Sequence, residues 1–206
     1  MSDRPDFSTE LAALARGLHR IAGVDEAGRG PLCGPVVAAA VVLDPRHIPP
    51  GLNDSKKLSP KRREGLFAQI IAQAEVGVGL ASVEEIDTIN ILRASHLAME
   101  RAIAALPCPP DHLRIDGNMI PRGLLLSAEA LVKGDARSLS ISAASIIAKV
   151  TRDRIMVDLA QQHPGYGWAK NAGYPTKDHL AALQTLGVTP HHRRSFKPIH
   201  NILYQA

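Results

Sequence analysis

The sequence predicts a single α/β domain whose C-terminal part is helical. The chain has 206 residues, which is long enough for one substantial buried core. Apolar runs of strand length occur in its first half, and helical patterns follow one another toward its end. Strands first, then strands mixed with helices, then helices alone are typical of a helix-covered sheet with a helical extension.

The first predicted strands surround a short segment of glycines and prolines. Residues 19–28 read as a strand that ends at two adjacent acids, Asp25 and Glu26. Residues 36–43 form an apolar run of buried-strand length, and a loop follows them. Residues 1–18 lie before the first strand. We expect them to be a helical N-terminal extension of a domain that spans residues 19–206.

The middle of the chain carries clear helix start signals. Ser59 followed by Pro60 predicts a helix over residues 61–74. A strand is expected next, and Ser82 with Glu85 then forms a capping box that opens the next helical region. The strand before this capping box spans residues 75–82. An amphipathic helix at 91–106 and a short strand at 111–118 complete this part.

The C-terminal half is predicted to be mostly helical. Residues 123–135 predict short strands or a strand and a turn, and residues 140–163 are the longest helical candidate. Residues 164–176 read as a loop. A helix follows it, with Thr176 as its N-cap and Gly187 just past its end.

Composition excludes several classes of protein. Apolar residues make up 45% of the chain, but no run of about 18 of them appears, so no membrane span is expected. The N-terminus lacks the pattern of a signal peptide. Cys33 and Cys108 stand alone, which favours a reducing cytoplasm over a disulfide framework. Neither cysteine is spaced as a metal ligand with another Cys or His, so zinc is not expected.

Positive charge is concentrated in two segments. The net charge is +4 and the isoelectric point is about 9.3, a modest excess that carries little weight alone. Residues 56–64 and 191–200 hold much of it. A solvated surface and a phosphate-binding footprint are both open interpretations of these segments.

The glycines after the first strand do not fit a dinucleotide-binding loop. Gly28, Gly30 and Gly34 have the spacing G-x-G-x-x-x-G, and the prolines between and after them obstruct the helix that such a loop requires. Glycines here are better suited to close backbone approach, with Arg29 held among them. Backbone N–H groups with a guanidinium suit a phosphate or a sugar edge.

Acidic side chains recur at predicted strand ends. Asp25 ends the first strand, while Glu26 faces the other way if the strand stays regular, or inward if the chain turns. Asp116 ends a later strand, and Asp135 follows in a Gly-Asp turn. Asp153 is a rival acid, for which a local ion pair with Arg152 or Arg154 is the simpler interpretation. Converging carboxylates form a hard-oxygen site that suits Mg²⁺ or Mn²⁺.

Aromatic and histidine side chains cluster late in the chain. Three of the few aromatic residues fall within 166–174, so this loop is a plausible contact surface. Packing is the favoured role for Tyr166 and Trp168. His191 and His192 are interpreted as tail residues rather than ligands.

Five separated blocks of the sequence resemble the type 2 ribonuclease H family, the bacterial ribonuclease HII. These blocks, which agree in sequence and in order, are GVDEAGRGPLCGPVVAAAVVL, NDSKKLSPKRRE, RIDGN, KGDARSLSISAASIIAKVTRD and PGYGWAKNAGYPTKDHL. The resemblance implies a ribonuclease H-like mixed sheet flanked by helices, with a helical C-terminal region. It also implies cleavage of RNA in RNA–DNA hybrids and at single ribonucleotides embedded in duplex DNA.

The resemblance assigns roles by position. It implies four metal-binding carboxylates, a Gly-Arg-Gly element that reads the 2′-hydroxyl at the RNA–DNA junction, and a tyrosine that packs on the next deoxynucleotide sugar. It also implies an Asp-Ser-Lys element near the nucleic-acid backbone. In this sequence these are Asp25, Glu26, Asp116 and Asp135; Gly28, Arg29 and Gly30; Tyr174; and Asp54, Ser55 and Lys56.

The expected chemistry is metal-assisted phosphodiester hydrolysis. Two Mg²⁺ or Mn²⁺ ions can activate a water and stabilise the leaving 3′-oxygen, which leaves a 3′-hydroxyl and a 5′-phosphate. We expect a cytoplasmic monomer without membrane contact that removes misincorporated ribonucleotides. A DNA nuclease of the same core should lack the Gly-Arg-Gly and GYPT elements, and a non-catalytic binding module would need no acid cluster.

Overall fold

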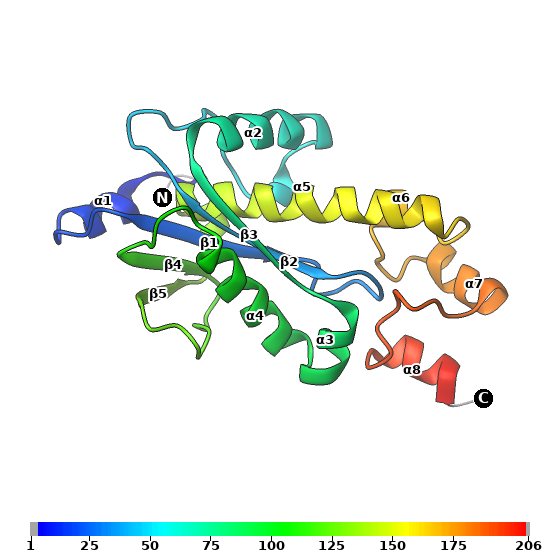
Figure 1. The fold of residues 1–206 in the computed structure, drawn as a ribbon. Coiled ribbons are helices and arrows are strands. Elements are labelled where there is room, and N and C mark those ends of the chain that lie inside the picture. Colours follow the sequence, from blue (N-terminus) through cyan, green and yellow to red (C-terminus); the bar gives the residue numbers. More distant parts are fainter. Residues whose placement is uncertain (1–3, 205–206) are drawn as a thin grey trace.

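A five-stranded mixed sheet forms the centre of the molecule (Figure 1). The computed structural model describes residues 4–204. The strands are β1 (Ile21–Ala27), β2 (Val36–Val42), β3 (Glu75–Ala81), β4 (His112–Asp116) and β5 (Ser127–Leu131). Their order is β3-β2-β1-β4-β5. β1 and β4 are parallel neighbours, so their carboxyl ends lie at the same edge of the sheet.

Helices cover both faces of this sheet and continue past one end of it. They are α1 (Ser8–Leu14), α2 (Pro60–Gln73), α3 (Val83–Ile89), α4 (Ile91–Ala104), α5 (Leu139–Gln162), α6 (Trp168–Asn171), α7 (Lys177–Leu186) and α8 (Lys197–Tyr204). α2 and α5 pack on one face, and α4 packs on the other (Figure 1). The predicted mixed sheet with a helical C-terminal region is confirmed. Within the described residues, no helix is both long and apolar enough to cross a membrane.

The apolar run of β2 is buried on both of its faces. Ala38 and Ala40 point toward α4, whereas Ala39 and Val41 point toward α2 and α5. A strand between two helical layers reads as a continuous apolar run rather than an alternating one, which explains its sequence.

Two glycines let helices approach the sheet closely. A Cβ on Gly23 would lie 2.1 Å from the backbone carbonyl carbon of Ser140, at the start of α5. A Cβ on Gly79 would lie 2.3 Å from the carbonyl oxygen of Ala98 in α4. Any side chain at either position would push a helix off the sheet.

The predicted helix caps are confirmed. The Ser59 hydroxyl accepts a hydrogen bond from the Arg62 amide, Ser82 and Glu85 form a reciprocal capping box, and Thr176 accepts from the His179 amide. The helical region that Ser82 opens is interrupted at Asn90. This residue has φ of +68° and caps α4 with its side chain.

One local prediction is incomplete. Residues 164–176, which read as a loop, contain the short helix α6 between Gly167 and Ala172. Both flanking residues have positive φ, so the turn is too brief to give a periodic pattern in the sequence.

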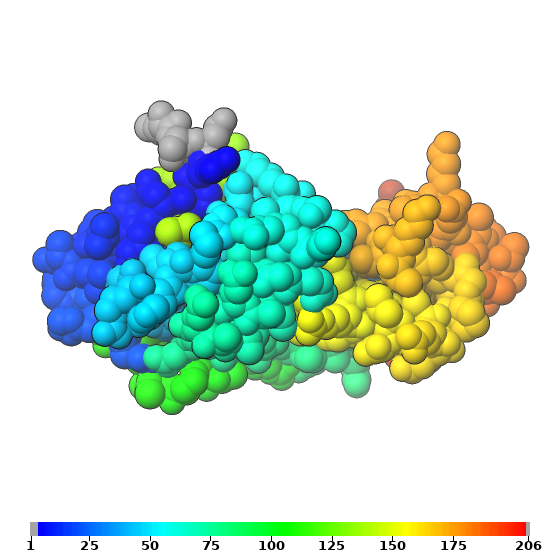
Figure 2. Space-filling model, turned by 90° about the horizontal axis from the view of Figure 1, so that it is seen from above, coloured from blue at the N-terminus to red at the C-terminus, as the bar shows by residue number. Residues whose placement is uncertain are grey.

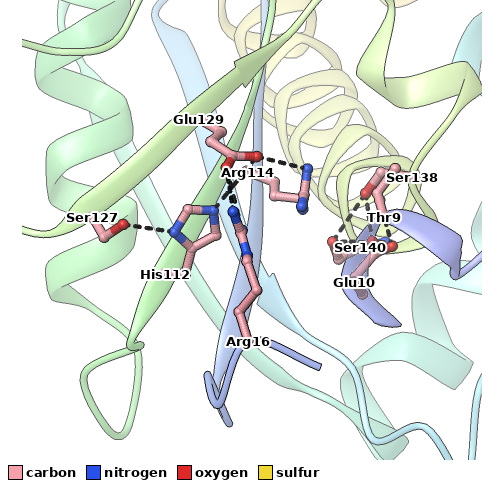
Figure 3. A network of polar contacts seen from close by, with 9 residues as sticks. All are labelled: Thr9, Glu10, Arg16, His112, Arg114, Ser127, Glu129, Ser138 and Ser140. Atoms are coloured by element: carbon pink, nitrogen blue, oxygen red, sulfur yellow. Dashed lines mark hydrogen bonds and ion pairs between the residues drawn. The ribbon is translucent and has the colours of Figure 1, made fainter. Parts of the chain in front are cut away.

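The predicted N-terminal helix is present as α1, and a buried acid fastens it to α5. The Glu10 carboxylate is 1% exposed and accepts hydrogen bonds from the Ser140 hydroxyl at 2.6 Å and the Ser140 amide at 3.0 Å (Figure 3). A second polar group lies on β4 and β5, where the Glu129 carboxylate meets the Arg114 guanidinium at 3.2 Å (Figure 3). A separate domain boundary at residue 18 stays a prediction.

A third apolar cluster joins the C-terminal helices to the loop after β1. Leu32 and Cys33 from that loop pack with Trp168, Leu183 and Ile199. The C-terminal segments gather at one end of the molecule, at the tip of α5 (Figure 2). This cluster therefore sets the glycine loop that follows β1 against the segment that contains Tyr174.

Candidate active site

Three of the four predicted carboxylates are positioned by two neighbouring strands. β1 and β4 pair in parallel with Val24 opposite Ile115, so the next residues along, Asp25 and Asp116, are neighbours just past the end of this pairing. Asp116 ends β4, whereas β1 continues to Ala27. Glu26 follows Asp25 directly. The predicted strand end at Asp25 is wrong by two residues, because pairing with β2 carries β1 to Ala27. The predicted strand end at Asp116 is confirmed.

Asp135 joins the group from a short 3-10 turn, η2 (Gly134–Ala136). The Gly134 amide donates to Oδ1 of Asp116 at 2.7 Å, which brings the turn against the end of β4. A Cβ on Gly134 would lie 3.2 Å from the same oxygen, so glycine permits this approach. The Ser142 hydroxyl of α5 donates to the Asp135 carbonyl and fixes the turn from the other side.

Glu26 lies within the regular strand β1, opposite Ala38 of β2, so its side chain leaves the opposite face of the sheet from Asp25, the first of the two orientations that the sequence left open. Its side chain is 11% exposed, and Oε1 lies 3.2 Å from Nη1 of Arg29. Asp25 is 6% exposed, and its Oδ1 accepts from the Glu26 amide at 2.8 Å. Both adjacent acids are thus largely withdrawn from water.

Burial and mutual repulsion raise the pKa values of three of these carboxyl groups. The pKa of Asp25 lies well above its ordinary value because of burial first, and then because of Glu26, Asp116 and Asp135. Burial also raises the pKa of Glu26, and Arg29 opposes that rise. The pKa of Asp135 rises to about 6 through burial and the charge of Asp116.

The Asp-Ser-Lys element faces this acid group. Asp54 caps the turn η1 (Ser55–Lys57) by accepting from the Lys56 amide at 2.9 Å, and the Ser55 hydroxyl accepts from Ser145 at 2.8 Å. Burial would lower the pKa of Lys56, yet the carboxylates around it, including Asp25 and Asp135, raise it. Lys56 is therefore a cation directed at the carboxylates.

A hollow of ≈ 360 Å³ brings most of the predicted residues together. We call it the central hollow. It is lined by the predicted residues Asp25, Glu26, Gly28, Arg29, Gly30, Ser55, Lys56 and Tyr174. Asp116 lines a smaller adjoining hollow that also contains Glu26 and Arg29. The Tyr174 side chain is 44% exposed, and its ring lies against Gly30.

Three residues of α5 line the central hollow without having been predicted there. They are Ser145, Lys149 and Arg152. No local sequence signal marks them, because their positions depend on how α5 crosses the sheet. Lys149 also accounts for Asp153, the rival candidate acid, because Nζ of Lys149 lies 2.7 Å from Oδ1 of Asp153. The predicted local ion pair of Asp153 exists, but with Lys149 rather than with either flanking arginine.

The interpretation of His192 as a tail residue is wrong. His192 is fully buried, and its Nε2 lies 3.1 Å from Nε2 of His179. With Sγ of Cys33, these three possible ligand atoms lie within 4.8 Å of one another. The sequence spacing concealed this group, because its members come from three distant segments.

Hydrogen bonds show that the two histidines already satisfy each other. The Thr189 amide donates to Nδ1 of His192, so His192 carries its proton on Nε2. Nδ1 of His179 donates to the Tyr174 carbonyl, so Nε2 of His179 is an acceptor. This Nε2 accepts hydrogen bonds from Nε2–H of His192 at 3.1 Å and from the Trp168 indole N–H at 3.0 Å. The structure thus groups Cys33 with two histidines, contrary to the prediction from the sequence that neither cysteine is placed with another possible ligand, and both Nε2 atoms are engaged in hydrogen bonds.

Other residues in the C-terminal part of the chain are either packed in the interior or exposed on the surface. Tyr166 and Trp168 are 5% and 0% exposed and stack on each other, so their predicted packing role is confirmed. In the basic segment 191–200, Arg193 is buried whereas Arg194 is exposed. This segment is therefore not a uniform solvated surface.

The sheet order, the helices on both faces and the acids at adjoining strand ends define an α/β protein of the ribonuclease H type. The sequence model of the family described as ribonuclease HII matches residues 22–199. The chain therefore belongs to the ribonuclease HII family and is a ribonuclease H enzyme.

Individual relatives agree with this placement. The ribonuclease HII of Ruegeria pomeroyi is 70% identical over 202 residues, which cover 98% of this chain and 86% of that protein. The crystal structure of ribonuclease H2 from Pyrococcus horikoshii OT3 matches with a TM-score of 0.75 and 31% identity, over 91% of this chain and 98% of that one. Bst-RNase HIII in complex with Mn²⁺ matches with a TM-score of 0.73 over 95% of this chain and 73% of that one; at 20% identity it supports the fold alone.

Proposed function

We propose that this enzyme cuts the RNA strand of RNA–DNA hybrids and also cuts 5′ of single ribonucleotides embedded in duplex DNA. The products are a 3′-hydroxyl and a 5′-phosphate. Family membership supplies the ribonuclease H activity. The observation that carries the finer proposal is the central hollow, where buried carboxylates adjoin a glycine loop, Arg29 and an exposed tyrosine.

The donor set fits a hard divalent cation. Asp25, Glu26, Asp116 and Asp135 offer only carboxylate oxygens, which Mg²⁺ and Mn²⁺ prefer. The pKa values of Asp25, Glu26 and Asp135 are raised by burial first and then by the neighbouring carboxylates, so a bound cation would favour their charged forms. We propose that these four residues hold Mg²⁺ or Mn²⁺, with two ions present when substrate is bound. Such ions supply an activated water and stabilise the leaving 3′-oxygen.

The residues around the acids bind and orient the nucleic acid. Gly28, Arg29 and Gly30 read the ribonucleotide 2′-hydroxyl, which every ribonucleotide has and DNA lacks. Tyr174 packs on the deoxyribose that follows. A third group, Asp54, Ser55 and Lys56, lies near the sugar–phosphate backbone, where the Lys56 ammonium offsets phosphate charge.

The consequence for the cell is removal of misincorporated ribonucleotides from DNA, the first cut of ribonucleotide excision repair. We propose that the enzyme does this as a cytoplasmic monomer. A single chain suffices because Asp25, Glu26, the glycine loop and Tyr174 line the central hollow, Asp116 lines the adjoining one, and Asp135 is held against Asp116 through the Gly134 amide.

The decisive experiment uses a DNA duplex with one ribonucleotide, incubated with and without Mg²⁺ or Mn²⁺. The expected result is a metal-dependent cut 5′ of the ribonucleotide and no cut in the matching all-DNA duplex. Cleavage of both duplexes would instead identify a DNA nuclease. Binding without cleavage would identify a non-catalytic binding module.

A further inference from the structure

Two buried arginines lie beneath the glycine loop that follows β1. Arg193 is 0% exposed and Arg152 is 1% exposed. Among the described residues, neither forms an ion pair with a carboxylate; their guanidinium groups bond to backbone carbonyls instead. Burying a charge without an opposite charge is costly. The cost points to a role for these cations in shaping the backbone that they contact.

Arg193 holds the glycine loop by its carbonyl oxygens. Nη2 donates to Gly28 at 2.6 Å, and Nη1 donates to Arg29 at 3.0 Å. Nη1 also donates to Pro31 at 2.9 Å, while Nε and Nη2 donate to Gly34 at 3.0 and 2.8 Å. All five guanidinium hydrogen bonds therefore end on residues 28–34.

Arg152 connects this loop to the segment that precedes Tyr174. Its guanidinium donates to the carbonyls of Cys33, Pro35 and Ala172, each at 3.0 Å. A Cβ on Gly28 would lie 2.0 Å from its Nε, so the guanidinium packs directly under that glycine. The two arginines thus tie together the loop with Arg29 and the loop with Tyr174.

The direction of these bonds determines which way the loop amides point. In a planar trans peptide, the C=O of one residue and the N–H of the next point in opposite directions. The carbonyls of Gly28 and Arg29 point inward to Arg193. The N–H groups of Arg29 and Gly30 are therefore directed away from Arg193, the orientation in which they can reach a ligand in the central hollow.

We propose that Arg193 and Arg152 are positioning residues for ribonucleotide recognition: they orient the Arg29 and Gly30 amides and set Tyr174 beside them. This inference rests on the proposed role of the glycine loop in reading the 2′-hydroxyl. Arg193 acts on the loop alone, whereas Arg152 acts on the loop and on the Tyr174 segment together.

The test measures recognition separately from catalysis. Every protein carries Asp116→Asn so that the ribonucleotide stays intact. The affinity for a DNA duplex with one ribonucleotide is divided by the affinity for the all-DNA duplex. We expect Arg193→Lys to lower this ratio roughly tenfold, because an ammonium cannot replace five fork-like donors. Affinity for the all-DNA duplex should stay within about twofold, since backbone charge contacts are retained.

Matched variants separate positioning from stability. Leu66→Ala removes a buried side chain in the α2 core, far from the loop, and lowers the melting temperature without touching the arginines. It should leave the affinity ratio unchanged. Arg193→Gln should lower the ratio further than Arg193→Lys, and Arg152→Lys gives an independent second variant if Arg193→Lys folds poorly.

The outcomes are distinct. A ratio unchanged in the folded arginine variants, or lowered equally in Leu66→Ala, overturns the inference while the proposed function stands. A parent protein that shows no preference for the ribonucleotide overturns the proposed function and this inference with it. A ratio that falls only in the arginine variants, with the Lys form retaining more than the Gln form, supports positioning.

Discussion

Tyr174 lies directly against Gly30, although the two residues are far apart in the chain. A Cβ on Gly30 would stand only 3.3 Å from Cε1 of the tyrosine ring. Two hydrogen bonds fix the backbone next to this contact. The Tyr174 carbonyl accepts from His179, and the Leu32 amide donates to the Gly173 carbonyl at 2.8 Å. The proposed 2′-hydroxyl reader and the proposed sugar platform are therefore parts of one rigid unit.

This unit predicts a substrate-dependent effect of Tyr174→Ala. In its proposed role, the ring would test the shape of the sugar after the ribonucleotide, where a ribose would add a hydroxyl to the contact. Cleavage at a single embedded ribonucleotide should fall roughly tenfold or more, on the scale of a lost aromatic stacking contact, and should fall less within a long hybrid. Comparing kcat/KM on both substrates checks this.

Tyr174→Phe is the matched control for that variant. It keeps the ring and removes only the phenol hydroxyl, so it should retain much of the preference. Equal losses on both substrates for Tyr174→Ala would show that the ring does not read the junction and serves loop packing instead.

Asp116→Asn should abolish cleavage and leave hybrid binding largely intact. The amide has nearly the volume of the carboxylate, and its Oδ1 can still accept from the Gly134 amide, so the fold should survive. The lost charge weakens metal binding, and turnover should drop by about 100-fold or more, the scale of removing a principal electrostatic contact. Near wild-type turnover in saturating Mg²⁺ would refute a role for Asp116 as a metal ligand.

The acid group should destabilise the metal-free protein. Asp25→Asn removes one buried, repelled charge, so the melting temperature without metal should rise above that of the wild type. Mg²⁺ or Mn²⁺ should raise the wild-type melting temperature by binding only the folded state. Thermal melts with EDTA and with each metal test both statements. A lower metal-free stability in both Asp25→Asn and Asp116→Asn would contradict the repulsion argument.

The same groups predict how metal-free stability depends on pH. The pKa of Asp135 rises from 3.8 to about 6 on folding. A carboxyl group with a raised folded pKa stabilises the fold when protonated, so its contribution is present below about pH 4 and is lost as pH rises through about 6. Asp135→Asn should flatten this part of the stability profile, measured by denaturant unfolding in EDTA.

His192 predicts the opposite dependence. Its pKa falls from 6.5 to about 4 in the folded protein, chiefly because of burial. The unfolded chain binds the proton more readily, so this group's contribution to stability is lost as pH falls from about 6.5 to 4. His192→Asn should reduce that loss, while His200→Asn, at an exposed site in α8, should keep the wild-type slope. Identical slopes in all three proteins would argue against a neutral buried His192.

Features that depend on local patterns could be predicted from the sequence. The strand-terminal position of Asp116 followed from an apolar run that stops at an acid, and the caps at Ser59, Ser82 and Thr176 followed from side-chain chemistry. The same rule ended the first strand two residues too early at Asp25, because pairing with β2 carries β1 through both acids. In contrast, the position of Lys149 in the central hollow could not be predicted, because it depends on how α5 crosses the sheet.

Buried cations were the least predictable feature. Arg193 lies in a segment that reads as basic surface, beside His192, which reads as tail. Arg193 is buried against carbonyls of the loop after β1, and His192 is buried against Tyr166, Trp168 and His179, so distant parts of the chain cover both residues. No local property of residues 191–200 distinguishes the buried arginine from its exposed neighbour Arg194.

The contact between Arg193 and residues 28–34 has a consequence for synthesis of the protein. The acid pair and the glycine loop leave the ribosome well before the guanidinium that holds the loop, because Arg29 and Arg193 are 164 residues apart in the chain. A nascent chain can pair β1 with β2 long before residue 193 is available. The glycine loop therefore cannot gain the support of Arg193 until that distant residue has been made, and a chain cut short before Arg193 would keep its acids without that support.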